Sequence, residues 1–268
     1  MSTMSDFDMR RDIVSYVALG DSFTEGLDDP YPDSGDSPYG RYRGWADRLA
    51  EHLAEHVHEV RYANLAVRGK LARQIVEAQV PRAVELNPDL VTLCAGGNDI
   101  LRPGSDPDQL AGVLERAVRR LSATGAEIVL FTGMDPGFQP VMRHLRGKSA
   151  TFNMHLRAMA DTHGCRVVDL WGMRALRNPG AWSWDRLHLS TEGHRRLALR
   201  VCEVLGIPAD GDWNSPWPAE DPKPWRVARQ DDLQWAREYL VPWIGRRLTG
   251  RSSGDGVPPK RPNLERLR

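Results

Sequence analysis

The chain has no apolar stretch that approaches the roughly 20 residues needed to cross a membrane. Residues 1–11 are polar and mixed in charge, and they lack the hydrophobic core of a secretory signal peptide. Neither sign of charge is in excess, because 36 basic residues balance 36 acidic ones, and this removes the electrostatic argument for a nucleic-acid partner. We therefore expect a cytoplasmic protein without a membrane span and without a nucleic-acid partner.

Cysteine is also scarce, with three residues, Cys94, Cys165 and Cys202, that lie far apart in apolar surroundings. Their odd number and wide spacing favour buried free thiols over disulfides. The sequence has no His-Glu-x-x-His, no Cys-x-x-Cys, no Walker-type glycine loop and no Gly-x-Gly-x-x-Gly after a strand. We expect neither a metal nor a cofactor.

Short apolar runs alternate with longer amphipathic segments along most of the chain. Strands alternating with helices of this length imply right-handed crossovers and a parallel sheet that is covered on both faces. The fold class is therefore α/β. The expected strands are 13–19, 60–64, 90–95, 128–132 and 167–170, and the expected helices are 44–56, 72–80 and beyond, 107–123, 149–163 and 191–205.

The pattern breaks after residue 207, so we expect a domain over 1–207, a Trp-rich extension over 208–250 and a disordered tail over 251–268. The extension holds five of the nine tryptophans, and this much apolar surface favours packing on the domain. Within it, 231–248 is expected to form an amphipathic helix that Pro242 kinks or ends. The tail is rich in Pro, Gly, Ser and Arg, a composition typical of disorder.

Three residues supply the groups of a nucleophilic catalyst, in the chain order Ser22, Asp185, His188. Serine needs a base to take its proton, and histidine titrates near working pH. Of the eight histidines, His188 is the one with a carboxylate three residues away in a loop before a helix. Taken singly, Ser22 also fits a turn serine at a strand-to-helix junction, and Asp185 and His188 also fit an accidental surface pair.

Four short motifs resemble the conserved blocks of the GDSL, or SGNH, hydrolases. They are Gly20-Asp21-Ser22-Phe23-Thr24-Glu25-Gly26, Asn64-Leu65-Ala66-Val67-Arg68-Gly69, Gly96-Gly97-Asn98-Asp99 and Asp185-Arg186-Leu187-His188. Each block alone is weak evidence, but all four family letters occur in order, and the resemblance extends over residues 13 to 206. It implies a three-layer α/β/α fold of the flavodoxin-like type, with a central, mostly parallel five-stranded sheet.

By the same resemblance, the oxyanion hole consists of the Ser22 backbone N–H, the Gly69 backbone N–H and the Asn98 side-chain amide. Without the other blocks, Gly69 fits a turn glycine and Asn98 an Asx-turn residue. Phe23 departs from the leucine of the family name. Arg68 and Lys70 flank the glycine, where they either bind an anionic part of the substrate or lie on the solvated start of a helix, and we favour the second interpretation.

The sequence thus predicts a serine hydrolase of the SGNH esterase or lipase type, which cleaves a small-molecule carboxylic ester through an acyl-enzyme on Ser22. One alternative is an acyltransferase or thioesterase that uses the same site. Another is a non-catalytic binding protein that acts through the extension. The sequence leaves the oligomeric state and the identity of the ester open.

Overall fold

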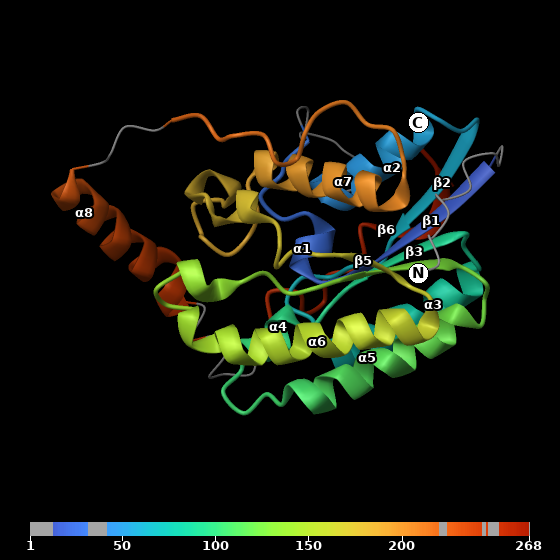
Figure 1. Cartoon of the computed structure of the whole chain (residues 1–268), viewed down its shortest axis with the longest axis horizontal. Coiled ribbons are helices and arrows are strands. Elements are labelled where there is room, and N and C mark those ends of the chain that lie inside the picture. The colour runs from blue at the N-terminus through green and yellow to red at the C-terminus, as the bar shows by residue number, and fades with distance from the viewer. Residues whose placement is uncertain (1–12, 32–41, 220–223, 243–244, 246–251, 268) are drawn as a thin grey trace.

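The computed structural model describes residues 13–31, 42–219, 224–242, 245 and 252–267. A central sheet lies between two layers of helices, with α2 and α7 on one face and α3, α5 and α6 on the other (Figure 1). The helices are α1 (Ser22–Glu25), α2 (Gly44–Ala54), α3 (Ala72–Leu86), α4 (Gly97–Ile100), α5 (Pro107–Ser122), α6 (Arg146–His163), α7 (Thr191–Leu205) and α8 (Trp225–Trp235).

The sheet has six strands in the order β5-β4-β3-β1-β2-β6. The first five are the strands expected from the sequence, and they pair in parallel as predicted: β1 (Ile13–Gly20), β2 (Glu59–Asn64), β3 (Leu90–Cys94), β4 (Glu127–Phe131) and β5 (Arg166–Val168). The sixth, β6 (Arg261–Arg266), runs antiparallel beside β2. The expected count of five strands was wrong by this one, and the three-layer α/β/α architecture is confirmed.

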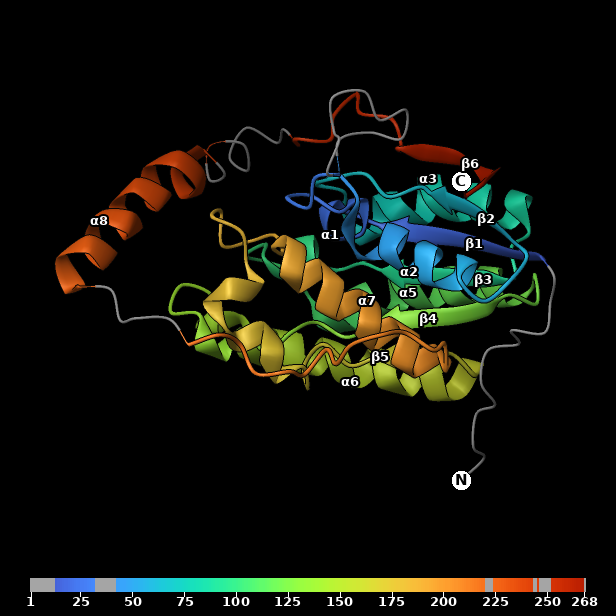
Figure 2. The same ribbon diagram turned by 90° about the horizontal axis from the view of Figure 1, so that it is seen from above.

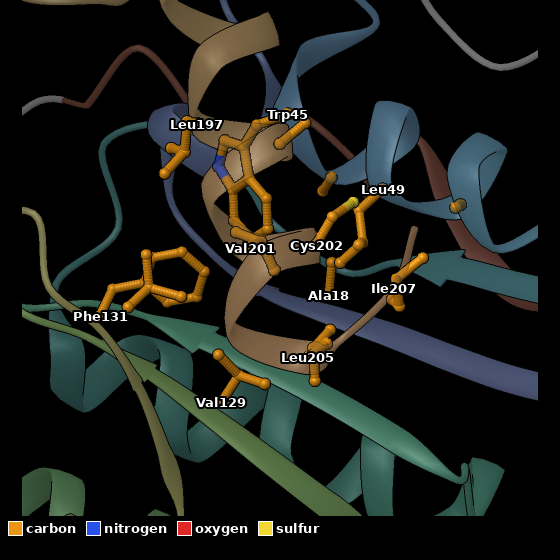
Figure 3. Close-up of a cluster of buried hydrophobic side chains, with 14 of the residues drawn as sticks. Ala18, Trp45, Leu49, Val129, Phe131, Leu197, Val201, Cys202, Leu205 and Ile207 are labelled. Atoms are coloured by element: carbon orange, nitrogen blue, oxygen red, sulfur yellow. The ribbon is translucent and has the colours of Figure 1, made fainter. Parts of the chain in front are cut away.

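Both faces of the sheet are buried, and the alternation of side chains along β1 divides them between two cores. Tyr16 and Ala18 face α2 and α7, whereas Val17 and Leu19 face α3, α5 and α6. In the first core Trp45 of α2 is fully buried, its ring 4.7 Å from that of Phe131. Figure 3 shows Trp45 and Leu49 meeting Leu197, Val201, Cys202 and Leu205 of α7 above the strands. A side chain buried to this degree contributes about 1.5–3 kcal/mol.

Local sequence signals account for where the predicted helices begin. The Ser190 side chain accepts a hydrogen bond from the Gly193 N–H and caps α7, as expected. Asp106 caps α5 in the same way, with Pro107 in the first turn. The expected helix boundaries agree with the observed ones to within a few residues. All three cysteines are free thiols, as predicted.

The tail is the main correction, because the expected disorder over 251–268 is contradicted by residues 252–267. The Lys260 side chain is 6% exposed, and its ammonium lies 2.8 Å from the Asp47 carboxylate of α2. It also donates to the carbonyl oxygens of Tyr42 and Arg43. Arg261 is buried, with its guanidinium 5.4 Å from the centre of the Tyr62 ring. Polar composition suggested disorder, but here the cations are the buried anchors of an edge strand.

The extension packs on the domain only in part. Trp213 and Trp217 lie against α7, where Arg200 and Arg196 stack on their rings. The next helix begins at Trp225, six residues before the expected start, and continues as a π-helical turn, η5 (Ala236–Leu240). It buries no residue, and Trp225 is 73% exposed, so the expected packing of that tryptophan was wrong. Trp243 lies outside the described residues.

Figure 2 shows α8 beyond the edge of the sheet at which the parallel strands end, and β6 at the side of the sheet next to β2. Within the described ranges, none of the helices combines the length and the apolar character needed to span a membrane.

Lys260→Met should lower the free energy of unfolding by about 3 kcal/mol, because removing one partner of a buried ion pair leaves the Asp47 carboxylate without its ammonium. Urea unfolding followed by circular dichroism measures this loss. Arg73→Met, which removes an exposed cation of α3 paired with Glu77, is the control and should change stability little. A Lys260→Met variant as stable as the wild type would contradict the anchoring role of the tail.

Candidate active site

Ser22 is the first residue of α1 and follows β1 after a single residue, Asp21. The Asp21 side chain accepts from the Phe23 N–H at 3.1 Å and so caps this short helix. Gly20 has no room for a side chain, since a Cβ would lie 2.7 Å from the carbonyl oxygen of Cys94 on β3. The close approach of the two strand ends fixes where the Ser22 hydroxyl stands.

The structure brings Ser22, His188 and Asp185 into one chain of hydrogen bonds. His188 Nε2 lies 2.9 Å from Ser22 Oγ, and His188 Nδ1 lies 2.5 Å from Asp185 Oδ2. The other carboxylate oxygen, Oδ1, accepts from the backbone N–H groups of Leu187 and His188, both at 2.9 Å. The three-residue spacing thus closes a turn in which the carboxylate holds both its own loop and the imidazole.

The electrostatics of this turn favour a charged pair. Burial alone would raise the pKa of Asp185, but the hydrogen bond and charge of His188, with two backbone N–H groups, lower it to about 2. Burial alone would lower the pKa of His188, but Asp185, and then the charges of Asp28 and Asp21, hold it above its ordinary value. The imidazolium that forms when a base takes a proton is therefore stabilised here.

A second buried histidine, His194 of α7, has the opposite environment. Burial lowers its pKa to about 4. Its Nδ1 accepts from the Trp45 N–H at 3.1 Å, and its Nε2 lies 3.1 Å from the Leu27 carbonyl oxygen. It therefore stays neutral and joins α7 to α2, as expected for a packing residue.

The third block places Asn98 beside the nucleophile. Its amide donates to Asp21 Oδ2 at 3.0 Å and to the Lys70 carbonyl oxygen at 3.1 Å. Burial raises the pKa of Asp21 to about 6, with the Phe23 N–H, His188 and the Asn98 amide acting against it. Asp21 thus has a structural role, because its carboxylate joins the turn at Ser22 to the turn at Asn98.

Gly69 is held near this turn but does not line the cavity in front of Ser22. Its φ is +72°, in the left-handed region that favours glycine. The neighbouring Arg68 side chain is partly exposed, and its guanidinium pairs with Glu25. The Arg68 backbone N–H donates to Glu25 Oε2 at 2.7 Å. Neither interpretation of Arg68 included this ion pair.

A cavity of about 190 Å³ opens in front of Ser22 and His188. Its walls come from the ends of β3 and β4, from the segment before α6 and from α6 itself. Apolar side chains dominate them: Phe23, Ile100, Leu101, Phe131, Met134, Met142, Leu145, Phe152, Leu170, Trp182 and Leu187. Ser22 therefore faces a pocket suited to an apolar group.

Two residues that the sequence analysis did not single out complete the surroundings of His188. Asp28 has a positive φ of 67°, and its Oδ2 lies 3.9 Å from His188 Nδ1. The Ser183 hydroxyl lies 2.6 Å from Asp28 and 2.7 Å from Asp185, and so joins the two carboxylates. Neither residue belongs to one of the four sequence blocks.

Asp28, Asp185 and His188 are also a group of potential metal ligands in the described part of the chain. Asp185 and His188 already use these atoms for each other, since Nδ1 faces Oδ2 at 2.5 Å. A cation bound there would have to break this hydrogen bond. The arrangement therefore fits a hydrogen-bonded pair better than a metal centre.

The fold is shared with several solved esterases and hydrolases of low identity. The crystal structure of TesA is 24% identical, with 71% of this chain and 97% of that chain covered and a TM-score of 0.57. LAE5, an alpha/beta hydrolase from the metagenome of Lake Arreo, Spain, is 24% identical (72% and 95% covered, TM-score 0.61). Axe2, an acetylxylan esterase from Geobacillus stearothermophilus, is 20% identical (75% and 95% covered, TM-score 0.58). At these identities the likeness shows the fold.

No curated protein matches the chain. The family comparison is decisive instead, because residues 18–196 match a single family, a range that begins inside β1 and contains all four sequence blocks. The chain belongs to the GDSL-like lipase/acylhydrolase family.

Proposed function

We propose that this protein is a serine hydrolase that cleaves a carboxylic ester with an apolar acyl group through an acyl-enzyme on Ser22. Family membership supports a hydrolase of ester substrates. The observation that carries the finer proposal is the chain of hydrogen bonds from Ser22 through His188 to Asp185 at the wall of an apolar cavity. A nucleophile, a base and an orienting carboxylate in this order define the roles of a triad.

In the proposed reaction, Ser22 Oγ attacks the acyl carbon while its proton passes to His188 Nε2. The imidazolium that results is stabilised by Asp185 and by the nearby charge of Asp28. His188 then gives the proton to the departing alcohol oxygen, which leaves the acyl group on Ser22. Water takes the place of the alcohol and repeats the two proton transfers, releasing the acid and restoring the serine.

The oxyanion needs donors that are already in place. We propose the N–H groups of Ser22 and Gly69 and the amide of Asn98 for this role. Both hydrogens of the Asn98 amide are engaged in the free protein, one by Asp21 and one by the Lys70 carbonyl oxygen. The hydrogen that now bonds the Lys70 carbonyl oxygen would bond the oxyanion instead. The bond of the other hydrogen to Asp21 keeps the amide oriented.

The size of the cavity supports a short or medium acyl group. Its volume of about 190 Å³ exceeds the roughly 150 Å³ of an engineered apolar cavity that holds benzene. An acyl chain of about four to eight carbons, or a single aromatic ring, is of the corresponding size. Most of the walls are aromatic or aliphatic, and the charged or titratable side chains among the lining residues are Asp21, Arg186 and His188.

Ser22→Ala should abolish ester turnover, measured with a chromogenic ester, without changing the unfolding temperature, because the hydroxyl is the attacking group. A phosphonate probe should add its mass to Ser22 in the wild type and to no residue in the variant. Ser122→Ala, at the far end of α5, is the control and should keep both turnover and labelling. Undiminished turnover in Ser22→Ala would end the proposal that Ser22 is the nucleophile.

kcat/KM should rise with pH through the pKa of His188, because the neutral imidazole is the base. Since nearby carboxylates hold this pKa above its ordinary value, the activity is lost as pH falls through that raised value. Asp28→Asn removes one of the stabilising charges and should move this limb to lower pH by on the order of half a unit or more. Asp161→Asn is the control: it changes an exposed residue near the opposite end of α6 and should leave the acid limb of kcat/KM in place. An unmoved acid limb in Asp28→Asn would exclude the Asp28 charge as a cause of the raised pKa of His188.

A panel of chromogenic esters from acetyl to dodecanoyl should give the highest kcat/KM at about four to eight carbons, as the cavity volume indicates. Ala95→Leu adds bulk to the cavity wall and should move the maximum to shorter chains. An optimum at acetyl in the wild type, or an optimum that Ala95→Leu does not move, would show that the acyl group lies elsewhere.

A further inference from the structure

The chain after residue 207 lies beyond the family match, which ends at residue 196, yet it returns twice to the proposed site. One contact is made by α8 on the turn that carries Asp185 and His188. The other is made by residues 252–256 on the segment that ends in Gly69. Both concern residues to which the proposed function gives catalytic roles, and the inference below rests on that function.

The first contact is a specific one between a tryptophan and a carbonyl group. The indole N–H of Trp235 donates to the carbonyl oxygen of Asp185 at 2.7 Å. The intervening Arg186 is held between the Trp235 ring, 5.0 Å from its guanidinium carbon, and Asp232, which accepts from it at 2.6 Å. Asp232 and Trp235, which lie one turn apart on α8, thus both contact this loop.

Arg186 is the part of the triad turn that most needs support. Its φ is +58°, and a left-handed conformation at a residue with a Cβ costs roughly 1–2 kcal/mol. The turn is what directs the Asp185 carboxylate at His188, because the same residues donate their N–H groups to Oδ1. The contacts of α8 lie on the outer side of this turn and oppose its relaxation.

The second contact is a close approach of two glycines. A Cβ on Gly69 would lie 2.2 Å from Ser252 Oγ, and a Cβ on Gly254 would lie 2.0 Å from the Arg68 carbonyl oxygen. Asp255 closes the turn at 252–256 by accepting from the Ser252 N–H at 2.8 Å. Gly69 therefore packs against the Ser252 side chain and Gly254 against the backbone of Arg68, and neither glycine has room for a Cβ.

This turn is anchored on its C-terminal side. Lys260 follows it and is buried against Asp47, and β6 then pairs with β2, the strand that leads to Gly69. A segment fixed in this way restrains the path of residues 67–69. The N–H of Gly69 is effective only if it stands where the oxyanion forms, since a displacement of 1 Å can cost about 10²-fold in rate.

We propose that the C-terminal segment is a positioning element of the active site: Trp235 holds the Asp185–His188 turn and Gly254 holds the Gly69 segment. Trp235 and Gly254 touch neither substrate nor reacting atoms. They act through the residues that do, so the expected signature is a lower kcat with an unchanged KM.

The test of the first contact is Trp235→Phe in the full-length chain, which keeps an aromatic ring and removes the N–H. We expect kcat to fall about 10-fold at constant KM, and the acid limb of kcat/KM to move to lower pH as the Asp185–His188 hydrogen bond weakens. The downfield proton resonance of His188 Nδ1 should weaken or shift in the same variant without any substrate present. Trp225→Phe, in the same helix and 73% exposed, is the matched control and should behave as the wild type.

The test of the second contact is Gly254→Ala, whose methyl group must push the Arg68 carbonyl oxygen away. We expect kcat to fall about 10-fold or more at constant KM, with the acid limb unchanged, because the oxyanion donor moves and the base does not. Gly112→Ala in α5 meets no neighbour within 4 Å and is the control.

Wild-type kcat, pH limb and proton resonance in Trp235→Phe, or an equal loss in Trp225→Phe, would overturn the role of Trp235. A rise in KM alone in Gly254→Ala would overturn the role of Gly254. These failures differ from failure of the proposed function, which would appear as turnover in Ser22→Ala and would overturn the positioning roles as well.

Discussion

The parallel pairing of β1 with β3 is the contact on which the site depends. Its register sets Gly20 opposite Cys94, so the turns that follow the two strands stand side by side. The chain continues from β1 to β2 on one side and returns to β3 on the other, which makes this the switch point of the sheet. Open α/β sheets bind their ligands at such a point, because the connections leave in opposite directions and open a crevice there. Ser22 and Asn98 occupy the two sides of it.

A second constraint is electrostatic, since three carboxylates surround one imidazole. Asp185 contacts His188 directly, while Asp28 and Asp21 act on it through their charge. This arrangement stabilises the imidazolium form of His188 and raises the pH below which that form predominates. In the proposed reaction the same charges would favour the transition state and would lower the activity at acid pH. The Ser183 hydroxyl keeps Asp28 and Asp185 in a fixed relation to each other.

The C-terminal segment gives this family member a feature that its match to the family does not contain. Buried ion pairs contribute little net stability, because desolvation offsets their attraction, but they fix geometry. Lys260 and Asp47 serve this purpose, as they join the last strand to α2 and leave the edge of β2 covered rather than open to other chains. In the proposed arrangement, the loops of the site are held by residues outside the range that the family match covers.

The sequence by itself determined the α/β class, the five parallel strands and the motifs of the site. The pattern carries this information because a strand buried on both faces is nearly continuously apolar, as 90–95 is, and because the first three blocks lie at the ends of strands. It also determined that Asp185 and His188 meet, since three residues of a tight turn leave them few other arrangements.

Tertiary structure alone decided what lies around these groups. Asp28 lies 160 positions before His188 in the sequence, and no local sequence pattern indicates that the two side chains come close together. The tail looked disordered because Lys260 and Arg261 are polar, and only the position of Asp47 and the open edge of β2 made their burial favourable. Likewise, the exposed ring of Trp225 and the bonded ring of Trp235 belong to one amphipathic helix, and the sequence cannot distinguish them. The loop that α8 contacts decides which of the two tryptophans forms a hydrogen bond with it. The reason is that a hydrogen bond depends on the position of its acceptor and not on the helix that carries its donor.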